Sequence, residues 1–133
     1  MSDRLVMEAG GPLGISGEAG SRVYTAAMPV RWSDQDLYHH VNHARMITLI
    51  EEARIPWLFE EGIPTATLAA GAVMTDLSVK YRGQVKRADG PVRIRMWCEK
   101  VGGALFVARH QVRGRDTPDS APPAVDCAAT IAA

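Results

Sequence analysis

The sequence lacks the features that mark several large classes of protein. No apolar run approaches the ~20 residues that a membrane-spanning helix requires, and charged residues interrupt the first residues where a secretory signal needs an apolar stretch. The 15 basic and 15 acidic residues cancel, so net charge favours neither nucleic acid nor a membrane as a partner. We therefore expect a cytoplasmic protein with no nucleic-acid or membrane partner.

Cysteine is scarce as well, since only Cys98 and Cys127 occur and no CxxC spacing is present. The simplest interpretation is a reduced chain with two buried thiols, although a disulfide between them is compatible with the sequence. Residues 1–21 are rich in glycine and small polar residues and predict a flexible tail. Residues 22–133 are then of single-domain size.

What the sequence does contain is a strand, a long helix and four more strands. The stretch "RVYTAAMPVRW" is typical of a first strand. From about residue 41 to 61, apolar residues recur in steps of three and four, which predicts a helix with a broad apolar face. Four later segments alternate apolar and polar residues and predict an antiparallel meander. One helix can bury such a face only against the concave side of a five-stranded sheet, so we predict an α+β fold.

Reactive side chains gather just before the helix, in "SDQDLYHHVNHARM". A helix start presents unpaired backbone N–H groups and the positive end of the helix dipole. Such donors can hold the oxyanion that forms when a thioester or ester is cleaved. A carboxylate a few residues earlier, Asp34 or Asp36, can attack that carbonyl or activate a water.

Simpler interpretations remain open for the same residues. Asp36 or Asn42 could cap the helix, because "SDQD" fits the capping-box pattern, and the histidines could be ordinary surface residues. Asp36, His40 and His43 could instead share a face and bind zinc or iron, although no later residue offers a dedicated fourth ligand.

Three other features have both a structural and a functional interpretation. Glu51 and Glu52 suggest an intrahelical ion pair with Arg54, or Glu51 could be a second carboxylate facing the substrate. Methionines such as Met46 fit either a core or an adaptable acyl tunnel. A basic cluster fits either a solvated face or a phosphate site; it comprises Lys80, Arg82, Lys86, Arg87, Arg93 and Arg95.

The stretch "VRWSDQDLYHHVNHARMITLIEEARIPWL" resembles the opening motif of the hot-dog-fold acyl-CoA thioesterases, the 4-hydroxybenzoyl-CoA thioesterase-like group. The matching residues are Arg31, Trp32, Asp34, Asp36, His40, Val41, Asn42, Glu51, Glu52, Ala53 and Arg54. The order of predicted elements matches too, so the resemblance covers residues 22–133. It implies a hot-dog fold, in which a five-stranded antiparallel sheet wraps around one long central helix.

The resemblance also implies roles for individual residues. Asp36 occupies the position of the catalytic carboxylate, and His43 that of a catalytic histidine in one branch, with its backbone N–H as the carbonyl-polarising donor. Asn42 helps to shape the turn, and Glu51 stays a candidate second carboxylate. His39 stands where the family usually has glycine. The candidate substrate-binding residues are His40, Met46, Lys80, Arg82 and Arg87.

The implied activity is hydrolysis of an acyl-CoA to a carboxylic acid and free coenzyme A. Coenzyme A is then part of the substrate, no other cofactor or metal is implied, and the family assembles as homodimers or homotetramers. One alternative keeps the fold but hydrates an enoyl-CoA, because Asp34-x4-His39 has the spacing of a hydratase motif. Another is a non-catalytic module that binds acyl-CoA.

Overall fold

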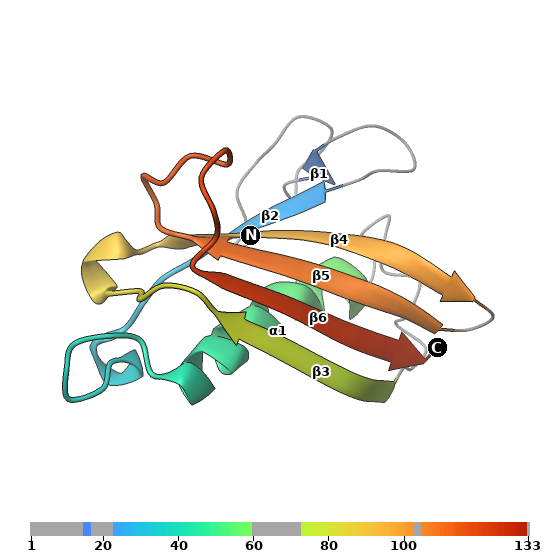
Figure 1. Cartoon of the computed structure of the whole chain (residues 1–133), viewed down its shortest axis with the longest axis horizontal. Coiled ribbons are helices and arrows are strands. Elements are labelled where there is room, and N and C mark those ends of the chain that lie inside the picture. The colour runs from blue at the N-terminus through green and yellow to red at the C-terminus, as the bar shows by residue number, and fades with distance from the viewer. Residues whose placement is uncertain (1–14, 17–22, 60–72, 103–104, 133) are drawn as a thin grey trace.

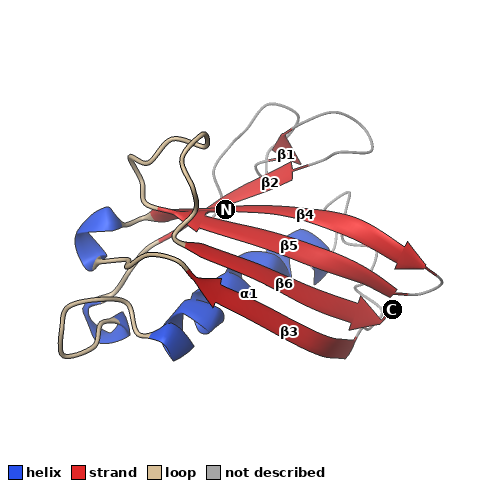
Figure 2. Ribbon diagram, in the orientation of Figure 1, coloured by secondary structure: helices blue, strands red, loops and turns tan. Residues whose placement is uncertain are grey.

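The computed structural model describes residues 15–16, 23–59, 73–102 and 105–132. All the strands lie in one antiparallel sheet of order β1-β2-β4-β5-β6-β3, and α1 crosses one face of it (Figures 1 and 2). The predicted α+β architecture with one long helix is confirmed. The elements are β1 (Ile15–Ser16), β2 (Val23–Met28), η1 (Trp32–Asp34), α1 (His43–Phe59), β3 (Val73–Tyr81), η2 (Arg87–Asp89), β4 (Val92–Gly102), β5 (Leu105–Arg113) and β6 (Val125–Ala132).

The sheet differs from the prediction in two ways. A sixth strand, the two-residue β1, pairs with β2 inside the segment predicted to be a tail. The predicted four-strand meander holds only for β4, β5 and β6, because β3 pairs with β6 at the far edge while β4 pairs with β2. The reason is that alternation of apolar and polar residues shows which face a strand buries but not which strand lies beside it.

The core lies between α1 and the inner face of the sheet. Met46, Leu49, Ile50 and Ala53 are the helix residues buried there. Strand residues alternate as expected, and β6 buries every second side chain from Val125 to Ile131. Burying a large apolar side chain contributes about 1.5–3 kcal/mol, so this interface holds α1 against the sheet.

The exposed edge of the sheet is β3. Of its nine residues only Val79 is partly buried, and the apolar side chains of Val73, Met74 and Leu77 are exposed. The register shifts by one residue between Met74 and Asp76. An unpaired edge with apolar side chains is a surface that another strand can pair with.

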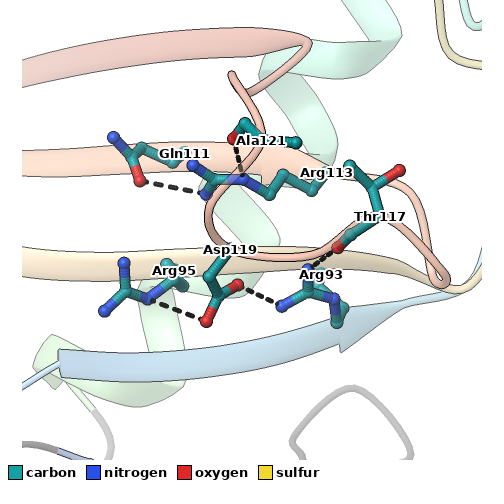
Figure 3. A network of polar contacts seen from close by, with 7 residues as sticks. All are labelled: Arg93, Arg95, Gln111, Arg113, Thr117, Asp119 and Ala121. Carbon is teal, nitrogen blue, oxygen red and sulfur yellow. Dashed lines mark hydrogen bonds and ion pairs between the residues drawn. The ribbon is translucent and has the colours of Figure 1, made fainter.

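The loop between β5 and β6 folds back over the outer face of the sheet (Figure 3). Asp119 forms ion pairs with Arg93 at 2.6 Å and with Arg95 at 3.8 Å. The buried Arg113 donates to the carbonyl of Ala121 at 2.9 Å and to the Gln111 side chain at 3.0 Å, and burial lowers its pKa. These contacts hold residues 114–124 against β4 and β5.

The two cysteines differ in their exposure to solvent. Cys98 and Cys127 are both free, and the prediction that both are buried is wrong for Cys98, which is exposed near the end of β4 while Cys127 lies in the core. Within the described residues, no helix has the length and apolar character needed to cross a membrane.

Candidate active site

Asp34 and Asp36 lie two residues apart but have different surroundings. The Asp34 side chain is 1% exposed; its Oδ2 accepts the Arg31 backbone N–H at 2.8 Å, and its Oδ1 pairs with the Arg31 guanidinium at 3.1 Å. Burial acts to raise the pKa of Asp34, but the hydrogen bonds and charge of Arg31 outweigh it, so the net shift is downward. Asp34 is therefore a structural carboxylate that holds the end of η1.

Only one of the two carboxylate oxygens of Asp36 accepts hydrogen bonds within the described residues. Its Oδ1 accepts the backbone N–H groups of Tyr38 at 2.8 Å and His40 at 3.2 Å, which fixes the carboxylate against its own turn. In the part of the chain that the structure describes, nothing donates to Oδ2. Asp36 is partly buried, so it combines a fixed orientation with an oxygen available to a substrate or a water.

Asn42 caps the helix that follows. Its Oδ1 accepts the backbone N–H of Ala44 at 2.9 Å, and its carbonyl accepts that of Met46 at 2.9 Å. Capping therefore belongs to Asn42 and not to Asp36. Among the described residues nothing accepts the N–H of His43 or Arg45. The exposed first turn of α1 thus keeps donors for a substrate oxygen.

The turn that carries Asp36 is clamped from both sides. The Asp36 N–H donates to the His40 carbonyl at 2.8 Å, and the Asn42 N–H donates to the Asp34 carbonyl at 2.9 Å. The Val41 N–H reaches the Val85 carbonyl at 2.6 Å, and His40 forms a β-bridge with Lys86. Residues 34–42 are therefore tied to the chain that follows β3.

Tyr81 is a site residue that the sequence did not reveal. Its side chain comes from the last position of β3, and its hydroxyl donates to the His43 carbonyl at 2.7 Å. The two rings meet edge to face, with centroids 6.3 Å apart. The only sequence signal was its place in the inward-facing alternation with Val79, which identifies a side chain on the helix side but not its contact.

The predicted residues on α1 do not all meet at its N-terminus. Glu51 is exposed and lies two turns along the helix from His43, or about 12 Å along the axis. Met46 is 2% exposed and belongs to the core cluster.

Arg54 points into the core toward the sheet. Its Nη1 lies 3.2 Å from His110 Nε2, and His110 Nδ1 lies 3.3 Å from the Cys127 carbonyl. Because a guanidinium only donates, Nε2 accepts and Nδ1 carries the proton. Burial lowers the pKa of Arg54 and outweighs the charge of Glu51, which acts to raise it; the intrahelical ion pair with Glu51 and Glu52 stays a prediction. Burial and the Arg54 charge lower the pKa of His110 to about 3, which keeps it neutral.

The predicted basic cluster divides between two places. Lys80 and Arg82 alternate with Tyr81 and so lie on the outer face of the sheet, where they line a pocket of about 290 Å³ and Arg82 pairs with Asp126 at 2.9 Å. Arg87 lies instead beside the turn that carries Asp36. It lines an open groove of about 520 Å³ with Val30, Trp32, Gln35, His39 and Pro91.

Two alternative interpretations, a metal site and a hydratase pair, receive little support from the geometry of these residues. Within the described ranges, no group of three or more His, Cys, Asp or Glu side chains is placed to hold a metal ion. The acid of the hydratase pair, Asp34, is buried against Arg31. Its partner His39 is exposed and faces Trp32.

A family model decides the affiliation of the chain. The model of the thioesterase-like superfamily matches residues 30–125, which include the clamped turn, α1 and the strands β3, β4 and β5. The chain belongs to the thioesterase-like superfamily. The predicted family and enzyme class, a thioesterase of the hot-dog fold, are confirmed.

Solved structures show the same fold. The PA2801 protein from Pseudomonas aeruginosa is 28% identical, with a TM-score of 0.67 over 81% of each chain. The YbaW protein from Escherichia coli is 21% identical, with a TM-score of 0.66 over 83% of this chain and 80% of that one. A Thermus thermophilus thioesterase in complex with coenzyme A and zinc is 21% identical, with a TM-score of 0.66 over 81% of this chain and 76% of that one. No curated protein matches the sequence significantly.

Proposed function

We propose that this member of the thioesterase-like superfamily hydrolyses acyl-CoA thioesters and that Asp36 is its catalytic carboxylate. The observation that carries the proposal is the contrast between the two acids. Both carboxylate oxygens of Asp34 accept hydrogen bonds from Arg31. The carboxylate of Asp36 is oriented through Oδ1 alone, and it lies next to a helix start whose backbone N–H groups are available to a substrate. The Thermus relative in complex with coenzyme A supports the substrate class.

The arrangement supports two routes for the reaction. In the first, Asp36 Oδ2 attacks the thioester carbon, the coenzyme A thiolate leaves, and water then hydrolyses the acyl–Asp36 anhydride. In the second, Asp36 accepts a proton from a water that attacks the same carbon. In both, the negative charge that develops on the thioester oxygen is stabilised by the N–H groups of the first turn, His43 foremost. We assign to the His43 imidazole, which is exposed at that turn, the role of orienting the water.

Asp36→Asn tests the proposal. The amide keeps an oxygen for the Tyr38 and His40 N–H groups but can neither attack nor accept a proton, so we expect kcat for thiol release to fall by about 10³-fold or more. Binding of acyl-CoA and the unfolding midpoint should stay near those of the wild type. Glu51→Gln is the matched control, and we expect its kcat to change little. A fully active Asp36→Asn, or a loss of activity confined to Glu51→Gln, would contradict the assignment.

We propose further that the chain acts as a homo-oligomer joined through β3. The support is the exposed edge, whose apolar side chains lie on a strand that also carries Tyr81. Pairing two such edges would cover the exposed backbone and place the partner beside the first turn of α1. A homodimer is the smallest assembly that does this, and a homotetramer would contain the same contact.

A further inference from the structure

The groove beside the catalytic turn has two aromatic walls. The Trp32 side chain is 68% exposed, and its ring centroid lies 6.0 Å from that of His39 with the planes tilted by 55°. The floor includes the apolar side chains of Val30 and Pro91. A volume of about 520 Å³ is in the range of small-molecule sites, about 300–1,000 Å³, so a planar ring system can lie in the groove against the exposed Trp32 ring.

The backbone at His39 is strained, with a φ of 63°. This left-handed region is accessible to glycine without penalty but is unfavourable for a residue with a side chain. Glycine would therefore be the most favourable residue for this backbone conformation at position 39. The chain instead places an exposed imidazole there, facing Trp32.

Arg87 supplies the groove with a cation on a fixed support. Asp89 ends η2, and its Oδ2 accepts the Lys86 N–H at 2.8 Å. The Asp89 carbonyl accepts the Arg115 N–H at 2.8 Å, so η2 is tied to the loop of residues 114–124, which Asp119 in turn joins to Arg93. No described carboxylate forms an ion pair with Arg87, which leaves its guanidinium for an anion.

Resting on the proposed thioesterase function, we propose that this groove binds the adenosine 3′,5′-diphosphate end of coenzyme A. The adenine lies against Trp32 and His39, since every base offers a π-face for stacking. A phosphate pairs with Arg87, whose planar donors match its geometry. Gln35 and His39 line the groove and flank Asp36, so the pantetheine arm joins the two ends of one continuous site.

The pocket on the outer face of the sheet fits this ligand less well. Two of its cations are already paired, Arg82 with Asp126 at 2.9 Å and Arg109 with Glu99 at 3.2 Å. It also lies on the face of the sheet opposite α1. Substitutions in the lining of that pocket therefore serve as controls for substitutions in the groove.

The test compares one acyl group carried by coenzyme A and by pantetheine, which lacks the adenine nucleotide. For Trp32→Ala we expect KM for acyl-CoA to rise about 5- to 160-fold, because stacking of a base on an aromatic ring contributes about 1–3 kcal/mol. The KM for acyl-pantetheine and both kcat values should stay unchanged. Arg87→Ala should raise KM for acyl-CoA but not for its 3′-dephospho analogue if Arg87 binds the 3′-phosphate. Trp97→Ala and Arg109→Ala on the outer face are the matched controls.

Several results would overturn the assignment. One is a wild type that hydrolyses both substrates with equal KM. Another is a Trp32→Ala that raises both KM values together, which would place the acyl group in the groove. A third is a Trp32→Ala variant whose oligomeric state changes while its KM for acyl-CoA does not. If the wild type hydrolyses neither substrate, the thioesterase proposal fails, and calorimetry with adenosine 3′,5′-diphosphate still decides the groove: binding that Trp32→Ala weakens supports it, and no binding refutes it.

Discussion

The hydroxyl of Tyr81 donates a 2.7 Å hydrogen bond to the main-chain carbonyl of His43, 38 residues earlier in the chain. One residue ends the edge strand β3 and the other begins α1. The contact ties the edge of the sheet to the first turn of the helix, where the thioester oxygen is proposed to bind. A change at the edge strand is therefore transmitted to the donors of the site.

Tyr81→Phe removes this bond and keeps the ring contact with His43. We expect the free energy of unfolding to fall by about 1 kcal/mol and kcat to fall about fivefold as the first turn loosens. Urea unfolding and thiol-release kinetics would measure the two effects. Tyr38→Phe, which also deletes a phenolic hydroxyl from an exposed tyrosine beside the site, is the control. An unaltered kcat in Tyr81→Phe would show that the bond does not position the turn.

Asp34→Asn should reduce stability far more than Asp36→Asn. The buried Asp34 carboxylate accepts the Arg31 N–H and its guanidinium, and weakening these bonds costs about 1–3 kcal/mol. Because the folded-state pKa of Asp34 is lowered, its contribution is present above about pH 4 and is lost as pH falls through the folded pKa. Denaturant unfolding of both variants at pH 7 and pH 3 would test this. Equal stabilities at pH 7 would contradict the structural role of Asp34.

His110 should make the protein less stable in mild acid. Its pKa is about 3 in the folded state against 6.5 normally, so between these values the unfolded chain binds a proton that the folded chain does not. The free energy of unfolding then falls as pH is lowered from 6.5, by at most about 1.4 kcal/mol per pH unit from this group. His110→Gln should flatten that slope, while His40→Gln on the surface turn should keep it. A wild-type slope in His110→Gln would mean that another group is responsible.

His39→Gly should stabilise the protein and weaken substrate binding together. Relief of the left-handed backbone at φ 63° is worth about 1 kcal/mol, whereas loss of the imidazole removes one wall of the groove and should raise KM for acyl-CoA. His39→Ala separates the two effects, because it loses the ring but keeps the strain. It should raise KM without raising the unfolding midpoint. A higher midpoint in both variants would argue against backbone strain.

Leu77→Lys should weaken the proposed assembly through β3. A charge at the centre of an apolar edge opposes its pairing with a second copy. Sedimentation velocity should therefore show a shift toward monomer. Leu105→Lys is a well-matched control, because Leu105 is 39% exposed and Leu77 is 38% exposed, and Leu105 is not on β3. An assembly that survives Leu77→Lys but not Leu105→Lys would move the interface.

Local patterns predicted the elements but not all of their neighbours. The step of three and four apolar residues located α1 to within two residues of its observed start at His43, because the apolar stripe is a property of consecutive residues. The place of β3 beside β6 could not be predicted in the same way. Alternation identifies which face a strand buries, but it does not name the strand with which it pairs.

The site was predictable in its position more than in its roles. The sequence placed acids and histidines before a helix, and the structure finds them there. It could not separate Asp34 from Asp36, because that distinction depends on the direction of the Arg31 side chain. It likewise grouped Lys80 with Arg87, which lie respectively on the outer face of the sheet and beside the catalytic turn.

The pairing of β3 with β6 also makes the proposed site depend on the last strand of the fold. The turn that carries Asp36 is bound by Val85, and the first turn of α1 is bound by Tyr81; Tyr81 ends β3 and Val85 follows it. β3 has its only strand partner, among the described residues, in β6 (Val125–Ala132). The chain must therefore be synthesised as far as β6 before β3 gains this partner. Pairing between strands so far apart in the sequence is slow to form, so we expect the proposed site to assemble late in folding.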